Sequence, residues 1–409
     1  MTPPSPGVRR RSLTRLTVLA LLSLPLTVVS FTSPAHADGP GSGTPWVVSV
    51  GDSYISGEAG RWAGNTNNGE SYHDALGDTA YYDNASNTGE QITRCHRSKA
   101  AEIIIGGGVS SLNLACSGAT TGTDASGSYF KPGIDFYNSG GNQGQALMLQ
   151  NFAATHNVKM VEVSIGGNNF HFADIVTQCV ADWASSPSWW PDYCKDDSVV
   201  TSNMSTSAVN ARRSEIAGAF QNIRTAMRSA GYADGSWTLL VSNYMSPIPN
   251  GSGFRYSESG YTRQSTGGCG FWNADADYAN GTLLPKINQT ISEAITNSGL
   301  TNTKTLNLAT AFNGRRLCEN TVGLLEEKGL SSWTAAGAVD KTEWINTIRT
   351  VTATGNYYIQ ESLHPNYWGE KALRNCVRQA WNSGTVKSGT CVRGANGLNA
   401  NGEPNMVLQ

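Results

Sequence analysis

The order of apolar segments along the chain constrains the fold more than any other feature of the sequence. Five short runs have the pattern of buried strands, at residues 46–50, 111–115, 158–165, 237–244 and 303–308. Helical patterns occur at residues 97–105, 145–156, 208–230, 284–295 and 367–381. This alternation predicts an α/β fold with a central parallel sheet and helices on both faces. Right-handed crossovers then bring the carboxyl ends of the strands to one edge, where ligands bind.

The segments between these elements are long and irregular. They are rich in Gly, Asn and Ser, and Gly accounts for 45 of 409 residues. We interpret them as insertions on a single domain of residues 38–391 rather than as linkers, and the sequence contains no internal repeat. Residues 392–409 are rich in Gly and Asn and are expected to form a flexible C-terminal tail. The insertions are expected at residues 60–94, 122–142, 181–206, 245–278 and 319–356.

Residues 1–37 have the features of a secretion signal peptide. Residues 9–15 carry four arginines, residues 16–29 form an apolar run, and residues 35–37 form an Ala-His-Ala cleavage motif. The apolar run is short for a membrane span, which needs about 20 residues. The alternative is an uncleaved membrane anchor. We expect a secreted, extracellular protein. Its mature chain has 25 basic and 31 acidic residues and lacks the basic stripe of a protein that binds nucleic acid, so we expect no nucleic-acid partner.

Eight cysteines follow the signal, and an even number in an exported protein indicates disulfides. Eight cysteines allow 105 pairings. We favour pairing between sequence neighbours, because it closes four local loops. None of the cysteines lies in a zinc-ligand spacing, so we expect no metal and no other cofactor. The favoured pairs are Cys95–Cys116, Cys179–Cys194, Cys269–Cys318 and Cys376–Cys391.

Four short motifs at strand or helix junctions carry groups that can do chemistry. Ser53 lies in a Gly-Asp-Ser turn directly after the first strand, where an α/β fold exposes a nucleophile. Gly118 follows the second strand, and Asn168 follows two glycines at the end of the third. Such positions suit backbone and amide donors to an oxyanion. His364 precedes the last helix, with Glu361 three residues before it, and can act as a general base.

In this order, the four motifs resemble the conserved blocks of the SGNH (GDSL-type) hydrolase family, and especially its secreted bacterial lipases, phospholipases and esterases. The resemblance implies a flavodoxin-like sheet and ester hydrolysis through an acyl-serine. It implies that Ser53 is the nucleophile and His364 the base that takes its proton. The oxyanion hole would consist of the Ser53 and Gly118 N–H groups and the Asn168 side chain.

The chain departs from the family pattern at one position. The family usually has Asp three residues before the histidine, whereas this chain has Glu361, whose side chain is one methylene longer. Some secreted members orient the histidine with a main-chain carbonyl instead, which here would be that of Ser362. We favour Glu361, because a carboxylate also stabilises the imidazolium that forms during the reaction.

A tryptophan-rich segment bears on the substrate. Trp183, Trp189 and Trp190 lie in the loop that Cys179 and Cys194 would close, soon after Asn168. They suit contact with an acyl chain or transient contact with a lipid interface. The alternatives are a structural cluster under the loop, or stacking on sugar rings.

We therefore expect a secreted ester hydrolase of the lipase or phospholipase A/B type that acts on phospholipids or other acyl lipids, with no partner protein evident. A carbohydrate or aryl esterase of acetyl or feruloyl type is the alternative within enzymes. The alternative outside enzymes is a catalytically silent SGNH-like module that binds cell envelope or polysaccharide. The presence of Ser53, Gly118, Asn168 and His364 favours the enzyme.

Overall fold

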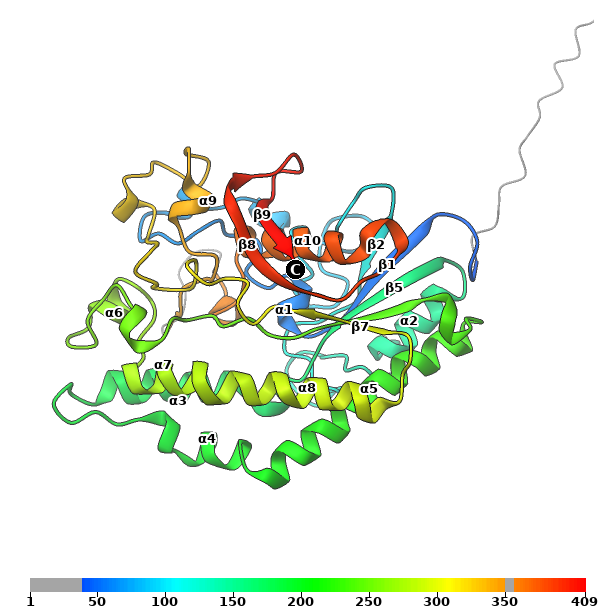
Figure 1. The fold of residues 1–409 in the computed structure, drawn as a ribbon, viewed down its shortest axis with the longest axis horizontal. Helices are drawn as coiled ribbons and strands as arrows, with labels where there is room; N and C mark the ends of the chain where they lie inside the picture. The colour runs from blue at the N-terminus through cyan, green and yellow to red at the C-terminus, as the bar shows by residue number, and fades with distance from the viewer. Residues whose placement is uncertain (1–38, 350–356) are drawn as a thin grey trace, which may run out of the picture. The chain divides into compact units, whose positions relative to one another are not determined.

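The computed structural model describes residues 39–349 and 357–409, so the predicted signal peptide lies outside the described residues. A seven-stranded sheet with the order β2-β1-β5-β6-β7-β8-β9 forms its centre (Figure 1). Neighbouring strands from β2 to β8 are parallel, and β9 pairs antiparallel with β8. The strands are β1 Pro45–Gly51, β2 Ser110–Asn113, β5 Asn157–Ser164, β6 Thr238–Ser242, β7 Thr303–Asn307, β8 Gly389–Leu398 and β9 Pro404–Leu408, and a separate hairpin pairs β3 Asn138–Ser139 with β4 Asn142–Gln143.

Helices cover both faces of this sheet. Helices α2, α5 and α8 pack against one another on one face, and α10 lies on the other (Figure 1). The predicted three-layer α/β fold is therefore confirmed. The first five strands of the sheet follow the flavodoxin-like order, in which the third parallel strand lies beside the first. The α-helices are α1 Ser53–Ser56, α2 Gln145–Ala153, α3 Phe172–Ser185, α4 Ser198–Asn203, α5 Thr206–Ser229, α6 Thr262–Ser265, α7 Asn273–Tyr278, α8 Leu284–Ser298, α9 Ala338–Lys341 and α10 Tyr367–Trp381.

The burial of both faces of β1 explains why its sequence is mostly apolar. Val47 and Val48 point to opposite faces of β1, and both are fully buried. Val161 on β5 is fully buried as well. A strand that is covered on both faces loses the alternation of apolar and polar residues that a half-exposed strand shows.

The last helix begins and ends where the sequence predicts. The side chain of Asn366 caps α10 by accepting hydrogen bonds from the N–H groups of Trp368 and Gly369. The helix ends at Asn382, which adopts the left-handed conformation. Because α10 starts three residues after His364, this capped start fixes the segment that carries the histidine.

The helix predicted over residues 97–105 is wrong. This segment forms irregular turns, although Ile103 and Ile105 are fully buried as the apolar pattern requires. The N–H group of Glu102 donates to the carboxylate of Glu370 on α10 rather than to a helical carbonyl. The Glu102 N–H thus bonds with a carboxylate 268 positions away instead of with a carbonyl of its own segment. The apolar side chains of the segment are therefore buried although no helix forms.

The flexible tail predicted for residues 392–409 is also wrong, because this segment completes β8 and forms β9. Met406 is buried, and the carboxylate of Glu403 binds the guanidinium of Arg378 on α10. Strand β9 pairs with β8 and packs against α10. A composition rich in Gly and Asn therefore marks tight turns between strands here rather than disorder.

All eight cysteines are paired as predicted. The disulfides are Cys95–Cys116, Cys179–Cys194, Cys269–Cys318 and Cys376–Cys391. Within residues 39–349 and 357–409, no helix has the length and apolar character required to cross a membrane.

Candidate active site

Ser53 lies at the carboxyl edge of the sheet, as the first residue of α1. Strand β1 ends at Gly51, which has a φ of 142°, and a Cβ there would stand 2.0 Å from the carbonyl oxygen of Ser164 on β5. Only glycine fits this close approach. The next residue, Asp52, caps α1 by accepting a hydrogen bond from the Tyr54 N–H. The turn therefore fixes Ser53 between the ends of β1 and β5, which is where open α/β sheets bind ligands.

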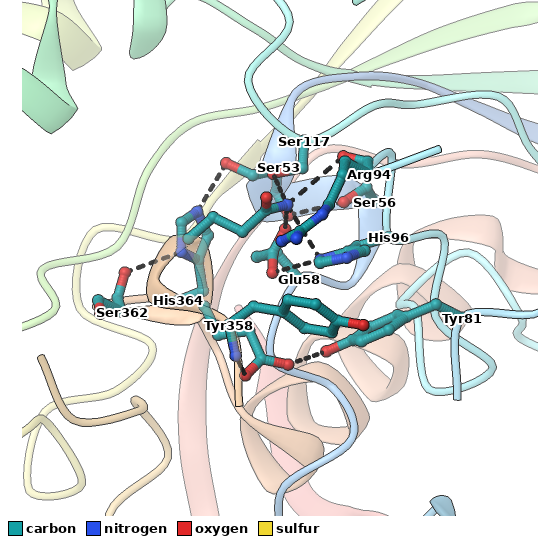
Figure 2. Close-up of polar contacts among 12 residues, drawn as sticks. Ser53, Ser56, Glu58, Tyr81, Arg94, His96, Ser117, Tyr358, Ser362 and His364 are labelled. Atoms are coloured by element: carbon teal, nitrogen blue, oxygen red, sulfur yellow. Dashed lines mark hydrogen bonds and ion pairs between the residues drawn. The ribbon is translucent and has the colours of Figure 1, made fainter. Parts of the chain in front are cut away.

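His364 lies directly against Ser53. Its Nε2 atom is 2.6 Å from Ser53 Oγ, and its Nδ1 atom is 2.9 Å from the main-chain oxygen of Ser362 (Figure 2). A carbonyl oxygen can only accept, so Nδ1 carries the hydrogen of the neutral ring. Nε2 is then the acceptor for the Ser53 hydroxyl. This is the tautomer that a general base requires.

The backbone before the histidine is held in an unusual conformation. Leu363 has a φ of 61°, in the left-handed region, and its carbonyl accepts a hydrogen bond of 2.9 Å from the Tyr54 hydroxyl. Tyr54 directly follows Ser53 in α1. Helix α1 and the segment that carries His364, which are about 310 positions apart in sequence, are therefore tied together beside Ser53 Oγ and the imidazole ring.

The Glu361 carboxylate makes no hydrogen bond with the His364 ring. Its buried carboxylate accepts hydrogen bonds from the Tyr81 hydroxyl, the Trp62 indole N–H and the Tyr358 N–H. Of the two orienting groups considered from the sequence, the Ser362 carbonyl is the one within hydrogen-bond distance of the ring. The preference for Glu361 is therefore corrected: the left-handed Leu363 turns the Ser362 carbonyl toward the imidazole, while Glu361 faces Tyr81 and Trp62.

The predicted oxyanion donors come from three loops at this edge. Ser53 begins α1, so its N–H has no acceptor within the helix. Gly118 has a φ of 80° and lies next to the Cys95–Cys116 disulfide. The Asn168 side-chain amide donates to the Ala119 carbonyl at 2.8 Å, which ties its turn to that of Gly118. The amide nitrogen has two hydrogens, so a second one is left for a ligand.

A tyrosine that the sequence analysis did not single out links two of these loops. The Tyr244 hydroxyl hydrogen-bonds with the Asp52 carboxylate and accepts a hydrogen bond of 2.9 Å from the Gly167 N–H. It therefore holds the turn before Asn168 against the turn before Ser53. Tyr244 is the last residue of the predicted fourth strand, and its place at the carboxyl edge is the signal that could have identified it.

A second polar network lies beside the dyad. The buried carboxylate of Glu58 pairs with His96 at 2.8 Å and accepts a hydrogen bond from the Gln360 side chain at 2.9 Å (Figure 2). The sequence analysis assigned no role to His96. The His96 ion pair lowers the pKa of Glu58 to about 2 even though burial alone would raise it, so Glu58 carries a negative charge.

The surroundings of His364 favour its neutral form. Burial lowers the pKa of His364, and the nearby negative charge of Glu58 and the Ser362 carbonyl oppose this effect. Burial also raises the pKa of Asp52 to about 7, against its hydrogen bonds from Tyr244 and Tyr54. The base can therefore accept a proton at neutral pH.

A narrow cavity of about 130 Å³ adjoins the dyad. Ser53, Asn168 and His364 are among the polar residues of its lining. Most of the remaining lining is apolar and comes from α3, from the segment after β6 and from the start of α8, including Ile175, Val176, Met245, Ile248, Leu283 and Ile287. A mostly apolar cavity with a few polar groups at one end suits an apolar group attached to an ester.

The three predicted tryptophans do not line this cavity. Trp183 is buried and packs against Trp272 and Tyr261, which corresponds to the structural cluster considered as an alternative. Trp189 and Trp190 are exposed to solvent in the loop after α3. Their prediction as acyl-contacting residues is therefore corrected, since the apolar lining consists of other residues, among them Phe172 and Phe271. Among the residues that the structure describes, no cluster of His, Cys, Asp and Glu has the arrangement of a metal site.

Comparisons with known proteins complete this description. No family model matches the chain, and no curated protein matches it. A solved structure of an extracellular lipase from Streptomyces rimosus aligns with it at a TM-score of 0.42 and 18% identity, over 84% of this chain and 100% of that chain.

Proposed function

We propose that this protein is a secreted serine ester hydrolase of SGNH type that cleaves acyl esters of lipids through an acyl-serine intermediate. The observation that carries the proposal is the chain of hydrogen bonds from Ser53 Oγ through the His364 ring to the Ser362 carbonyl, beside an apolar cavity. A serine is a poor nucleophile unless an adjacent base removes its proton, and this chain supplies an oriented base.

The reaction would proceed in two displacements. Ser53 Oγ attacks the ester carbonyl carbon while His364 Nε2 takes the hydroxyl proton. The tetrahedral intermediate collapses, the C–O bond to the alcohol breaks, and Nε2 returns the proton to the leaving alcohol. Water then attacks the acyl-serine while Nε2 takes a water proton, the bond from the acyl carbon to Ser53 Oγ breaks, and Nε2 returns the proton to Ser53 Oγ as the carboxylic acid leaves. The imidazolium formed in each step is held by the Ser362 carbonyl and lies in the field of ionised Glu58.

The negative oxygen of the tetrahedral intermediate needs donors in place before the reaction begins. The N–H groups of Ser53 and Gly118 and the second amide hydrogen of Asn168 are the proposed donors. The contacts through Ala119 and Tyr244 support this role, because they fix two of the three loops relative to α1.

The cavity bears on the substrate class. Its lining is predominantly apolar and mixes aliphatic side chains with Phe172 and Phe271, which favours an acyl chain over a sugar ring, because a sugar ring needs many polar partners. We therefore infer a lipid or phospholipid acyl ester as substrate. Four disulfides fit folding in an oxidising compartment, which agrees with export by the predicted signal peptide.

Hydrolysis by purified protein tests this function. We expect the wild type to release fatty acid from phosphatidylcholine vesicles and to cleave p-nitrophenyl butyrate. Ser53→Ala should lower both rates about 10³-fold or more. Ser242→Ala is the matched control, because Ser242 is a buried serine at the carboxyl end of β6 that hydrogen-bonds with Glu162 instead of a histidine. It should keep its activity.

The products separate the remaining candidates. Glycerophosphocholine would show that both acyl chains are removed, as a phospholipase B does. Cleavage of acetylated sugars or aryl esters without fatty acid release would replace the lipid assignment with a carbohydrate or aryl esterase. Full activity of Ser53→Ala would contradict the nucleophile, and folded wild type inactive on every ester would favour a silent binding module.

A further inference from the structure

We propose that the loop after α3 is a docking site for an electroneutral lipid surface. We call its turn at residues 187–191 the tryptophan tip, after Trp189 and Trp190. The role of this docking site rests on the proposed function, since a lipid surface would present the ester substrate to the active site. Binding to the lipid surface can be measured without any hydrolysis.

Exposure is the first observation. Trp189 and Trp190 are 80% and 74% exposed, which makes them the most exposed large apolar side chains among the described residues. Trp183 in the same loop is 3% exposed, so the loop buries one indole and leaves two in water. Exposed indoles are costly in water and favourable at the boundary between acyl chains and headgroups, where the ring is buried and its N–H remains hydrated.

The turn of the tip is braced by hydrogen bonds and by a disulfide. The Trp190 N–H donates to the Pro187 carbonyl at 2.8 Å, and the Asp192 N–H donates to Ser186 Oγ at 2.9 Å. The Ser186 hydroxyl in turn donates to the Asp182 carbonyl at the end of α3. The Cys179–Cys194 disulfide closes the base of the loop. Two indoles presented on a rigid turn lose little conformational freedom when they insert.

Position connects the tip to the site. Helix α3 begins just after the Asn168 turn and ends at the tip, and its 14 residues span about 21 Å. Phe172, Ile175 and Val176 of α3 line the cavity, and so does the Cys179–Cys194 disulfide. In Figure 1 the loop between α3 and α4 projects away from both helices. One helix therefore has its start at the candidate site, its side along the cavity and its end at the exposed tryptophans.

Charge selects the kind of surface. The charged residues that follow the tip are Asp192, Lys195, Asp196 and Asp197, and Lys195 is paired with Asp196 at 2.7 Å. The base of the tip is therefore net negative, and an anionic membrane would repel it. A zwitterionic surface such as phosphatidylcholine is free of this repulsion and offers the interfacial region that indoles prefer.

Vesicle flotation tests the proposal without turnover. In a Ser53→Ala background, the full chain should bind phosphatidylcholine vesicles, and Trp189→Ala with Trp190→Ala should lower the vesicle partition coefficient about tenfold or more, as the loss of two buried indoles requires. Replacing both with Phe should restore most of the binding. Tyr72→Ala, which removes an aromatic that is 40% exposed in a different loop, should change nothing.

Three results would overturn the proposal. These are unchanged binding by the double Ala variant, binding only to anionic vesicles with loss in high salt, and lipid-free self-association that the double variant abolishes. In the Ser53 wild-type background, the double variant should keep its rate on p-nitrophenyl butyrate and lose rate on vesicles. Vesicle binding by a wild type that cleaves no ester would refute the proposed function and leave the docking site standing, whereas ester cleavage without vesicle binding would do the reverse.

Discussion

The Ser362 carbonyl and the left-handed Leu363 decide how His364 is oriented. A main-chain carbonyl holds the neutral tautomer as well as a carboxylate does, and it carries no charge to stabilise the imidazolium. The nearest ionised group acting on the ring is Glu58, whose charge is itself partly balanced by His96. In a Ser-His-Asp triad the negative charge belongs to the group that hydrogen-bonds with Nδ1 of the histidine. Here it belongs to Glu58, which is not the hydrogen-bond partner of Nδ1.

Glu361→Gln tests this reading at a single residue. We expect kcat/KM to stay within about threefold of wild type, because the carboxylate bonds with Tyr81 and Trp62 and not with His364. The free energy of unfolding should fall by about 1–3 kcal/mol. The Glu361 carboxylate has two oxygens that accept hydrogen bonds, whereas the Gln amide has one, so a buried donor would lose its partner. Ester kinetics and urea unfolding measure the two effects. A loss of 100-fold or more in kcat/KM from a folded variant would show that the carboxylate serves the histidine.

Tyr244→Phe tests the link between the two loops. Loss of its hydroxyl frees Gly167 and Asp52, so kcat should fall roughly 10- to 100-fold with little change in KM. Tyr232→Phe is the matched control. The Tyr232 hydroxyl, like that of Tyr244, accepts a hydrogen bond from a backbone N–H, but it lies at the start of β5 and donates to a backbone carbonyl there. Equal kcat for the two variants would mean that Tyr244 serves stability alone.

At the scale of elements, what could be predicted depends on how local the determinants are. Half of the eight residues of β5 are buried apolar side chains, and α10 has its cap and its stop within its own sequence, so both were predictable. The structure of residues 97–105 was not predictable, because the Glu102 N–H in this segment donates to the carboxylate of Glu370 on α10, which is distant in sequence. The choice between Ser362 and Glu361 was equally out of reach, since it depends on one backbone dihedral at Leu363.

Strand β9 offers a prediction about the segment expected to be a tail. Met406 is 6% exposed and packs into the core, whereas its neighbour Val407 is 44% exposed. Met406→Ala should therefore destabilise the protein by about 2–5 kcal/mol, and Val407→Ala by less than about 1 kcal/mol. Urea unfolding followed by fluorescence measures both. Equal, small effects would mean that β9 contributes nothing to the folded domain.

At the scale of the whole molecule, buried carboxyl groups set the response to pH. Burial raises the pKa of Asp52 and Glu361 to about 7 and that of Glu162 to about 8. Burial also raises the pKa values of Glu102 and Glu370. The folded state therefore binds these protons more tightly than the unfolded state does. Their contribution to stability is full below about pH 4 and is lost as the pH rises through 7 and 8.

The melting temperature should accordingly fall between pH 6.5 and 8. His73 and His364 have lowered pKa values and act in the opposite direction, but their effect is complete near pH 6.5. Glu162→Gln removes one of the buried acids and should make the decline shallower. Asp124→Asn, at an exposed carboxylate, should leave the slope unchanged. A melting temperature that is flat or rising across this range would contradict the buried-acid account.

The topology of the molecule was the most predictable level. Alternating strands and helices predicted the parallel sheet, and the sheet edge brings Ser53, Gly118, Asn168 and His364 to one region as the motifs suggested. Which groups support them, such as Tyr244 and Glu58, follows from tertiary packing, and no short motif encodes it.

The central claim is that Ser53 is a nucleophile activated by His364, and covalent labelling tests it most directly. We would treat the folded protein with a fluorophosphonate and locate the adduct by peptide mass spectrometry. The account predicts stoichiometric labelling of the Ser53 hydroxyl, much slower labelling in His364→Asn, and none in Ser53→Ala. An unlabelled folded wild type, or an adduct on a different serine, would contradict it.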